Sequence, residues 1–261
     1  MHAAETRHFW FVGTRNVIVD VLSRALGTAL EGARVLDVGC GTGYTLSRLP
    51  AGVRATGIDI SSTSVALARE RAPSATIVQG SAGALPFEDG SFDACIALDV
   101  LEHLDDDLGA ARELARVVRP GGVVLITVPA LKILWHAHDE ALHHRRRYTL
   151  AEIVSVVERA ELLVEKQSYY NFLLFPLVFG QRVGSRLLGL SDSGDSDLSI
   201  PPAPLNRVLG AILSSERYLL EHLRLPIGVS CLVVARAPHA TGPQNGATPS
   251  RGGRSVRAER E

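Results

Sequence analysis

The chain has 261 residues, 46% of them hydrophobic, and a formal net charge of −1. This length provides a sizeable core, so we expect one domain with an elaboration rather than two equal domains. The small net charge argues against a global electrostatic attraction to nucleic acid or to acidic lipid.

The cysteines and the chain ends bear on where the protein works. Cys40, Cys95 and Cys231 lie far apart within apolar segments, which indicates reduced thiols in the cytoplasm rather than a disulfide framework. The N-terminus lacks a basic segment followed by an apolar one, so no signal peptide is expected. The most apolar stretch, residues 172–180, is far shorter than the roughly 20 residues that cross a bilayer. The Gly-, Pro-, Ser- and Arg-rich tail, 239–261, is predicted to be disordered.

Helical and strand patterns alternate through the first half of the chain. Apolar residues recur at helical spacing from Phe9 to Leu30, which predicts a first helix. Ser61 or Ser62 is expected to cap a later helix, and the Arg-Pro-Gly-Gly run at 119–122 to end another. The elements predicted after the first helix are a strand over 33–38, a helix from 45, a strand over 54–60, a helix over 61–72, a strand over 75–80, a strand over 92–100, a helix over 105–118 and a strand over 123–129.

Short apolar strands that alternate with helices predict an α/β fold with a doubly wound, mostly parallel sheet. Beyond Pro129 the pattern predicts a helix over 149–162, opened by Thr149 with Glu152 as in a capping box. Strands over 163–170 and 228–237 flank a long apolar insertion, 171–225, and are expected to pair antiparallel at the edge of the sheet.

A glycine-rich loop follows the first predicted strand. Gly39, Gly41 and Gly43 come directly after Asp37, at a position where open parallel sheets bind ligands. A dinucleotide loop requires a third glycine where this chain has Tyr44 or Leu46. Asp37 would also repel a pyrophosphate. A ligand with positive charge therefore fits this loop better than a dinucleotide does.

A second acid ends the next strand. Asp59 lies 20 positions after Gly39 (59 − 39), a spacing that suits a carboxylate accepting hydrogen bonds from ribose hydroxyls. The two acids and the loop together predict a ligand with a ribose and a cationic part. The alternative is that Asp37 and Asp59 are ordinary polar strand ends.

Four stretches resemble class I S-adenosylmethionine-dependent methyltransferases. They are VLDVGCGTG, GIDIS, LPFEDGSFDACIALDVLEHL and RVVRPGGVVLITVP, in the order typical of that family, from about Arg34 to Pro129. The flanking HFWFVGTR and HDEALHHRRRYT resemble a bacterial, methyltransferase type 11-like subgroup associated with polysaccharide, glycolipid or natural-product pathways. The resemblance implies a Rossmann-like seven-stranded sheet with an antiparallel edge strand and a helical C-terminal insertion. It divides the chain into a helical lid (1–32), a cofactor-binding core (33–130), a substrate-side region (131–238) and the tail (239–261).

The resemblance also assigns roles to individual residues. The loop and its acid would hold the methionine part of the cofactor, Asp59 the ribose and Ile60 the adenine. Ser81 replaces an aspartate that usually meets the adenine amino group, with Ala82 beside it, and Leu98 would line the methionine pocket. The implied cofactor-binding residues are thus Asp37, Gly39, Cys40, Gly41, Gly43, Asp59, Ile60, Ser81, Ala82 and Leu98.

The candidate general bases are His103, His138, His144 and Tyr148, which follow strands four and five. Each has a structural alternative: a hydrogen bond within a recurrent motif for His103, and a capped, solvated loop for His138 and His144. Asp139 could orient either of the latter histidines or pair with Arg146. Glu102, His103, His136, His138 and His143 could together hold a divalent metal, but no spacing enforces this arrangement, so no metal is predicted.

The function predicted is methyl transfer from S-adenosylmethionine to a small molecule or a lipid-linked sugar, without nucleic acid. The alternatives are a cofactor-binding module without turnover and, disfavoured by Tyr44 and Leu46, a nicotinamide-dependent dehydrogenase. The basic run 144–147 is either an anion site or a solvated loop. The apolar residues 172–190 form a buried cap, a pocket wall, a dimer contact or a peripheral membrane contact. The oligomeric state is left open.

Overall fold

The computed structural model describes residues 2–187 and 199–239. Residues 188–198 of the predicted insertion, and the tail from residue 240, lie outside the described residues.

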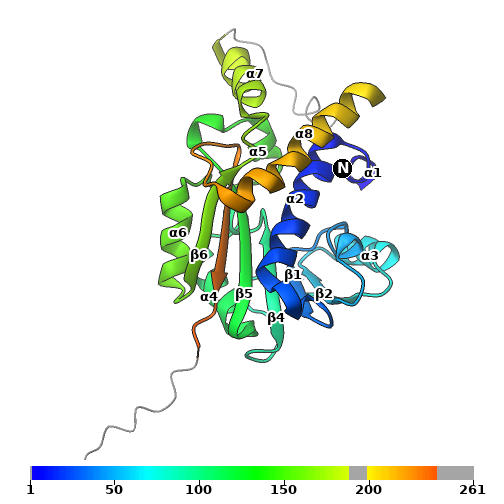
Figure 1. Ribbon diagram of the computed structural model, residues 1–261, viewed down its shortest axis with the longest axis vertical. Helices are drawn as coiled ribbons and strands as arrows, with labels where there is room; N and C mark the ends of the chain where they lie inside the picture. Colours follow the sequence, from blue (N-terminus) through cyan, green and yellow to red (C-terminus); the bar gives the residue numbers. More distant parts are fainter. Residues whose placement is uncertain (1, 188–198, 240–261) are drawn as a thin grey trace, which may run out of the picture.

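One seven-stranded sheet forms the centre of the molecule (Figure 1). Its spatial order is β3-β2-β1-β4-β5-β7-β6. The strands are β1 (Arg34–Val38), β2 (Arg54–Asp59), β3 (Thr76–Gln79), β4 (Phe92–Leu98), β5 (Val118–Pro129), β6 (Leu163–Tyr170) and β7 (Ser230–Arg236).

The predicted fold class is confirmed, and β7 is the strand that reverses direction. β1 to β5 pair in parallel, whereas β7 runs antiparallel to both β5 and β6. The antiparallel strand therefore lies one place inside the edge, which β6 occupies. The predicted pairing of the two strands that flank the insertion is confirmed.

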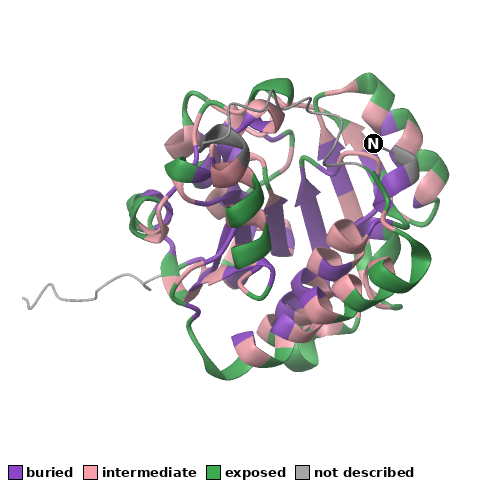
Figure 2. Cartoon of the chain, turned by 90° about the horizontal axis from the view of Figure 1, so that it is seen from above, coloured by how far each residue is buried: buried purple, intermediate pink, exposed green. Residues whose placement is uncertain are grey.

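Helices cover both faces of the sheet, so its strands are largely buried (Figure 2). α2 (Phe9–Leu26) and α8 (Ala203–His222) pack together on one face, where Ile18, Leu22 and Leu220 meet β1, β4 and β7. α4 (Asp107–Val117) and α6 (Leu150–Arg159) cover the other face. The remaining helices are α1 (His2–Glu5), α3 (Ser62–Arg71), α5 (Ala137–Ala141) and α7 (Phe175–Leu187), with 3-10 turns η1 (Gly27–Leu30), η2 (Leu46–Arg48), η3 (Leu101–His103) and η4 (Lys132–Leu134).

Local sequence signals set two of the helix starts. The Ser61 hydroxyl accepts a hydrogen bond from Ser64 N–H and caps α3. Thr149 and Glu152 form the predicted capping box of α6, in which the Glu152 carboxylate accepts from Thr149 N–H at 2.7 Å. Both predicted caps are confirmed.

Two predicted boundaries are wrong. The helix expected from residue 45 is only the single turn η2, because Pro50 follows too soon for further turns and disfavours a helical conformation at Leu49. The Arg-Pro-Gly-Gly run does not separate α4 from the next strand, because β5 begins at Val118 and contains the run. Gly121 has φ +74° there, and the pairing with β4 shifts register between Phe92 and Ala94.

The register brings the predicted acids to one edge. Asp37 pairs with Gly57 on β2 and with Ile96 on β4. Asp59 is the last residue of β2 and lies two positions beyond Gly57 on the same strand. Because β1, β2 and β4 are parallel, their carboxyl ends meet at this edge, and η3 follows β4 directly there.

Across residues 2–187 and 199–239, no helix combines the length and the apolar character that crossing a membrane requires.

Candidate functional site

The loop after β1 is shaped by glycine. Gly39, Gly41 and Gly43 all have positive φ, at +70°, +53° and +76°, which side-chain-bearing residues rarely adopt. A Cβ on Gly39 would lie 2.5 Å from Val100 Cγ2, and one on Gly43 would lie 2.9 Å from Ala68 Cα. A Cβ on Gly41 would meet no described atom within 4 Å. The loop is thus packed at both ends and open at its middle, where a ligand can approach the backbone.

Most donors of this loop already have partners. Gly39 N–H and Cys40 N–H both donate to Ile58 O, at 2.8 and 3.0 Å. The Cys40 side chain packs into an apolar cluster with Leu46 and Val65. The implied role of Cys40 in cofactor binding therefore does not extend to its thiol. The helix predicted from residue 45 is only the single turn η2, so no long helix directs its N-terminal dipole at this loop.

Asp37 lies under the loop with an unmatched carboxylate. The residue is 1% exposed, and its Oδ2 has no hydrogen-bond partner among the described residues. Burial raises the pKa of Asp37 to about 7, the charge of Arg15 lowers it, and that of Asp59 raises it. A buried acid without a partner is well placed to meet a cationic group.

Arg15 of α2 is a residue that the sequence analysis missed. Its guanidinium lies 5.6 Å from the centroid of the Tyr44 ring, and its Nε is buried without a described partner. Arg15 precedes Ile18 and Leu22 by three and seven positions, so it shares their buried stripe. An arginine on that stripe is the signal that could have identified it.

Asp59 organises the loop as well as its own strand end. Its Oδ2 accepts a hydrogen bond from Gly41 N–H at 2.9 Å, and its Oδ1 accepts from Ser61 N–H at 2.8 Å. A carboxylate has about four lone-pair positions, so two remain available for ribose hydroxyls. Next to it, the Ile60 side chain is 72% exposed, which leaves an apolar surface free at the predicted adenine position.

The remaining implied cofactor residues are half-buried near this edge. Ser81 Oγ accepts a hydrogen bond from Gly83 N–H at 3.2 Å and is otherwise available to a ligand amine. Ala82 and Leu98 pack at the margins of the two main apolar clusters.

The N-terminal segment crosses the loop. Glu5 accepts a hydrogen bond from the Thr42 hydroxyl, and Arg71 Nη1 of α3 approaches the same carboxylate at 2.5 Å. Phe9 N–H donates to Asn206 Oδ1 of α8 at 2.9 Å. These contacts hold the predicted lid against both the loop and α8, while Trp10 and Phe11 are half-buried within α2.

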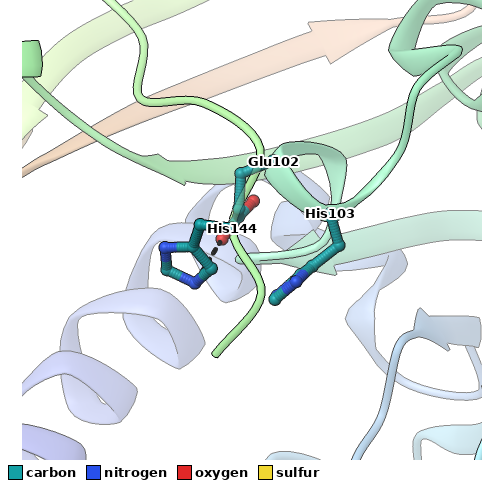
Figure 3. Close-up of side chains that lie close together, drawn as sticks. All are labelled: Glu102, His103 and His144. Carbon is teal, nitrogen blue, oxygen red and sulfur yellow. Dashed lines mark ion pairs between the residues drawn. The ribbon is translucent and has the colours of Figure 1, made fainter. Parts of the chain in front are cut away.

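Two of the candidate bases meet in one cluster beside β4. Glu102, His103 and His144 each have a ligand-type atom, and these atoms all lie within 4.8 Å of one another (Figure 3). His144 Nε2 lies 3.9 Å from Glu102 Oε1, and the two imidazole rings make an edge contact at 4.8 Å between centroids. Burial and the charge of His144 lower the pKa of His103, which favours its neutral, basic form.

Asp139 holds His144 in place. Its Oδ1 lies 2.8 Å from His144 Nδ1 and 2.9 Å from Arg147 Nε. Burial alone would raise the pKa of Asp139, but the hydrogen bond with His144 and the charge of Arg147 lower it to about 2. Asp139 therefore stays ionised and orients His144, one of the partners considered from the sequence. The arginine with which it pairs is Arg147 and not Arg146.

The other two candidate bases lie outside this cluster. The Tyr148 hydroxyl donates to Asp107 Oδ2 at 2.9 Å, and burial raises the pKa of this phenol. Tyr148 thus ties its segment to α4 through this hydrogen bond. His138 lies on α5, where its N–H donates to His136 Nδ1.

The basic run 144–147 has acidic partners. Arg146 Nη1 lies 3.0 Å from Asp107 Oδ2, Arg145 pairs with Asp105, and Arg147 pairs with Asp139. Arg145 and Arg146 therefore tie the segment after β5 to the acidic start of α4, and Arg147 ties it to Asp139. The anion site stays a prediction.

Part of the chain is similar in sequence to known methyltransferases. Residues 36–126 match the family model described as Methyltransferase domain. A protein of Mycolicibacterium smegmatis named as an S-adenosylmethionine-dependent methyltransferase is 34% identical over 149 residues, which cover 56% of this chain and 58% of that protein. The chain spans about half the length of the curated relatives it matches.

Solved structures share the fold. A methyltransferase in complex with the Haloferax volcanii Trm112 methyltransferase activator superposes with a TM-score of 0.55 at 24% identity, over 87% of this chain and 95% of that one. The [4+2]-cyclase SpnF superposes with a TM-score of 0.56 at 21% identity, over 86% and 82%. At these identities the likeness concerns the fold.

Proposed function

We propose that this chain, which contains a class I S-adenosylmethionine-dependent methyltransferase domain, transfers a methyl group from that cofactor to a small or lipid-linked acceptor. The observation that supports this most directly is Asp37, a buried carboxylate with an unpartnered oxygen beneath an open glycine loop. S-adenosylmethionine carries an ammonium group and a sulfonium centre, so its charge is complementary to this acid.

The residues at the strand ends fit the other parts of the cofactor. Asp59 keeps lone pairs for the ribose after bonding to Gly41 and Ser61. The exposed Ile60 offers an apolar contact for the adenine. The buried Arg15 guanidinium would receive the cofactor carboxylate.

The reaction requires alignment and, for a hydroxyl acceptor, a base. The bound cofactor supplies a methyl group on a good, neutral leaving group, and holding the acceptor in line provides much of the rate enhancement. His103 is the preferred base, because it follows β4 at the cofactor edge and its pKa is lowered. His144 is second, since Asp139 fixes its orientation.

The acceptor side would be formed by residues 131–187. Arg182 Nη1 of α7 donates to Leu134 O at 2.8 Å and lies 4.0 Å from Asp139 Oδ2, so α7 is joined to the segment that carries His144. Leu177 on α7 is 56% exposed, and α7 projects from the upper end of the molecule in Figure 1. We infer a cytoplasmic enzyme that touches a membrane surface through α7 when it meets an apolar or glycolipid acceptor.

A cofactor-binding protein without methyl transfer is the second candidate. The fold is compatible with it, because a structure of the same fold is named as a cyclase. The two candidates differ in turnover and not in cofactor affinity.

Calorimetric titration with S-adenosylmethionine and a methyl-transfer assay over a panel of hydroxylated acceptors test the proposal. We expect one cofactor per chain. Asp59→Ala should weaken the affinity by about 1–3 kcal/mol, because it removes the ribose bonds and releases the Gly41 N–H that Asp59 holds. Asp89→Ala, an exposed acid on the loop before β4, should leave the affinity unchanged. Absence of binding by the native chain would refute the proposal, and tight binding without any product would favour the second candidate.

A further inference from the structure

Glu102 carries a buried carboxylate that the protein does not satisfy. The residue is 0% exposed, and neither of its side-chain oxygens has a hydrogen-bond partner in the described part of the chain. Leaving such a group without a partner is strongly unfavourable. A second acid, Asp99, lies close enough to add to the negative charge at Glu102, and the nearby Arg147 is engaged by Asp139.

His144 is held with one ring nitrogen toward this carboxylate. Its Nδ1 bonds to Asp139, which leaves Nε2 facing Glu102 Oε1 at 3.9 Å. When Nδ1 donates its proton to Asp139, Nε2 of the neutral ring carries a free lone pair. A carboxylate that fixes the far nitrogen of a histidine is the arrangement found behind histidine ligands of metals.

His103 completes the set from the other side of Glu102 (Figure 3). Two residues with left-handed backbone flank the cluster, Asp99 at φ 55° before η3 and His143 at φ 57° before His144. Such conformations in residues other than glycine carry a cost of order 1–3 kcal/mol and concentrate at functional sites. The chain thus turns sharply just before each of the segments that carry these side chains.

We propose that Glu102, His103 and His144 bind a divalent transition-metal ion, with Asp139 as the positioning residue for His144. Two imidazoles and one carboxylate favour Zn²⁺, Mn²⁺ or Fe²⁺ over Mg²⁺ or Ca²⁺, which take oxygen ligands. Ligand atoms bound at about 2.0–2.2 Å lie roughly 3–3.5 Å apart, so the three side chains would need to move together by about 1 Å. This set differs from the one considered in the sequence, because His144 takes the place of His136, His138 and His143.

The ion has a role in methyl transfer that rests on the proposed function. An acceptor hydroxyl bound to the ion would lose its proton to water more easily, because the positive charge lowers its pKa. That oxygen then forms the new bond to the methyl carbon, while the carbon–sulfur bond breaks and its electron pair stays on sulfur. The acceptor class would accordingly be an alcohol or enol, and His103 would act as a ligand in place of a base.

Titration of the chelator-treated full chain with Zn²⁺, Mn²⁺ and Co²⁺ tests the site without cofactor or acceptor. We expect one ion per chain by calorimetry, a visible absorption band for Co²⁺, and a rise in Tm of about 5 to 10 °C at a hundredfold excess over Kd. Glu102→Gln and His144→Gln should each abolish the high-affinity step, and Asp139→Asn should weaken it about 10- to 100-fold.

Two histidine variants serve as controls. His143→Asn lies next to the site, is exposed, and keeps a residue that tolerates a left-handed backbone. His222→Gln removes an exposed histidine of α8. Both should bind the ion as the native chain does. Binding that is lost equally in the controls, or retained in Glu102→Gln and His144→Gln, would overturn the proposal.

A measurement on the native chain tests the site even if the variants fail to fold. Metal should protect His103 and His144, but not His222, from modification by diethylpyrocarbonate, as read by mass spectrometry; equal modification with and without metal would contradict the site. Because cofactor titration is separate, intact cofactor binding without metal binding would reject the metal site alone.

Discussion

Asp37 is a buried acid whose protonation depends on what binds above it. Without a ligand, burial raises the pKa of Asp37 from its ordinary value of 3.8 to about 7. Between these pH values the folded state therefore holds a proton that the unfolded state releases. The contribution of Asp37 to the free energy of unfolding is therefore complete in acid. It falls by about 1.4 kcal/mol per pH unit as the pH rises from 4 to 7.

Cofactor binding should show the opposite trend. A cationic ligand favours the ionised acid, so affinity for S-adenosylmethionine should weaken by up to tenfold per pH unit below pH 7, with proton uptake by the acid competing against binding. Asp37→Asn should bind weakly and lack this pH dependence. Calorimetry at pH 5.5, 6.5 and 7.5 checks both statements, and an equally steep profile in the variant would assign the effect to another group.

Some residues of the site could be predicted from the sequence, and others could not. Asp37 and Asp59 were predictable because strand ends and glycines fix them along the chain. Arg15 stands on the apolar stripe of α2 and was recognisable there, but what its guanidinium meets depends on how α2 packs in space. The choice of His144 over His138 as the partner of Asp139 likewise depends on which loops meet, and no local pattern encodes that. Tyr148 shows the converse: its phenol lies in the right segment but is directed to Asp107.

The crossing of α2 and α8 depends on a glycine. A Cβ on Gly13 would lie 2.5 Å from Leu213 Cβ, whereas a Cβ on Gly210 would meet Phe9 at 3.7 Å, an ordinary contact. Both positions would gain about 0.5–1 kcal/mol in helix propensity from alanine. The overpacking at Gly13 opposes this gain by about 1–3 kcal/mol.

We therefore expect Gly210→Ala to raise the free energy of unfolding and Gly13→Ala to lower it relative to Gly210→Ala by about 1–3 kcal/mol. Urea denaturation followed by circular dichroism measures both variants under one condition. Equal urea midpoints for the two variants would mean that α2 and α8 can move apart at Gly13 without loss of stability. That result would contradict the close approach of the two helices.

Among the elements, periodicity predicted the strands and the helices α2, α3, α4 and α6, whereas α7 and α8 lie in the insertion to which periodicity assigned no helix. The helix after β1 was mispredicted because Pro50 limits it to a single turn. The start of β5 was misjudged because the Arg-Pro-Gly-Gly run is accommodated inside the strand by a register shift. The position of β7 inside the edge requires long-range pairing, which sequence spacing alone does not determine.

At the scale of the molecule, exposed leucines test the inferred membrane contact. Leu177 on α7 and Leu163 at the start of β6 are similarly exposed, at 56% and 58%. Burial of one leucine in lipid provides about 1.5–3 kcal/mol. Leu177→Asp should thus lower binding to phosphatidylcholine–phosphatidylglycerol vesicles about tenfold in a flotation assay, whereas Leu163→Asp should not. A lack of vesicle binding by the native chain, or equal losses in both variants, would reject the contact through α7.

The packing of α8 on α2 has a consequence for how such proteins can diversify. α8 ends the insertion between β6 and β7, and α2 carries Arg15 to the glycine loop. Grafting a foreign insertion to change the acceptor would therefore disturb the cofactor end as well, unless the first helix were transplanted with it. Chimeras that exchange both α2 and the insertion should retain their affinity for the nucleoside. Chimeras that exchange only one of the two segments should bind it more weakly.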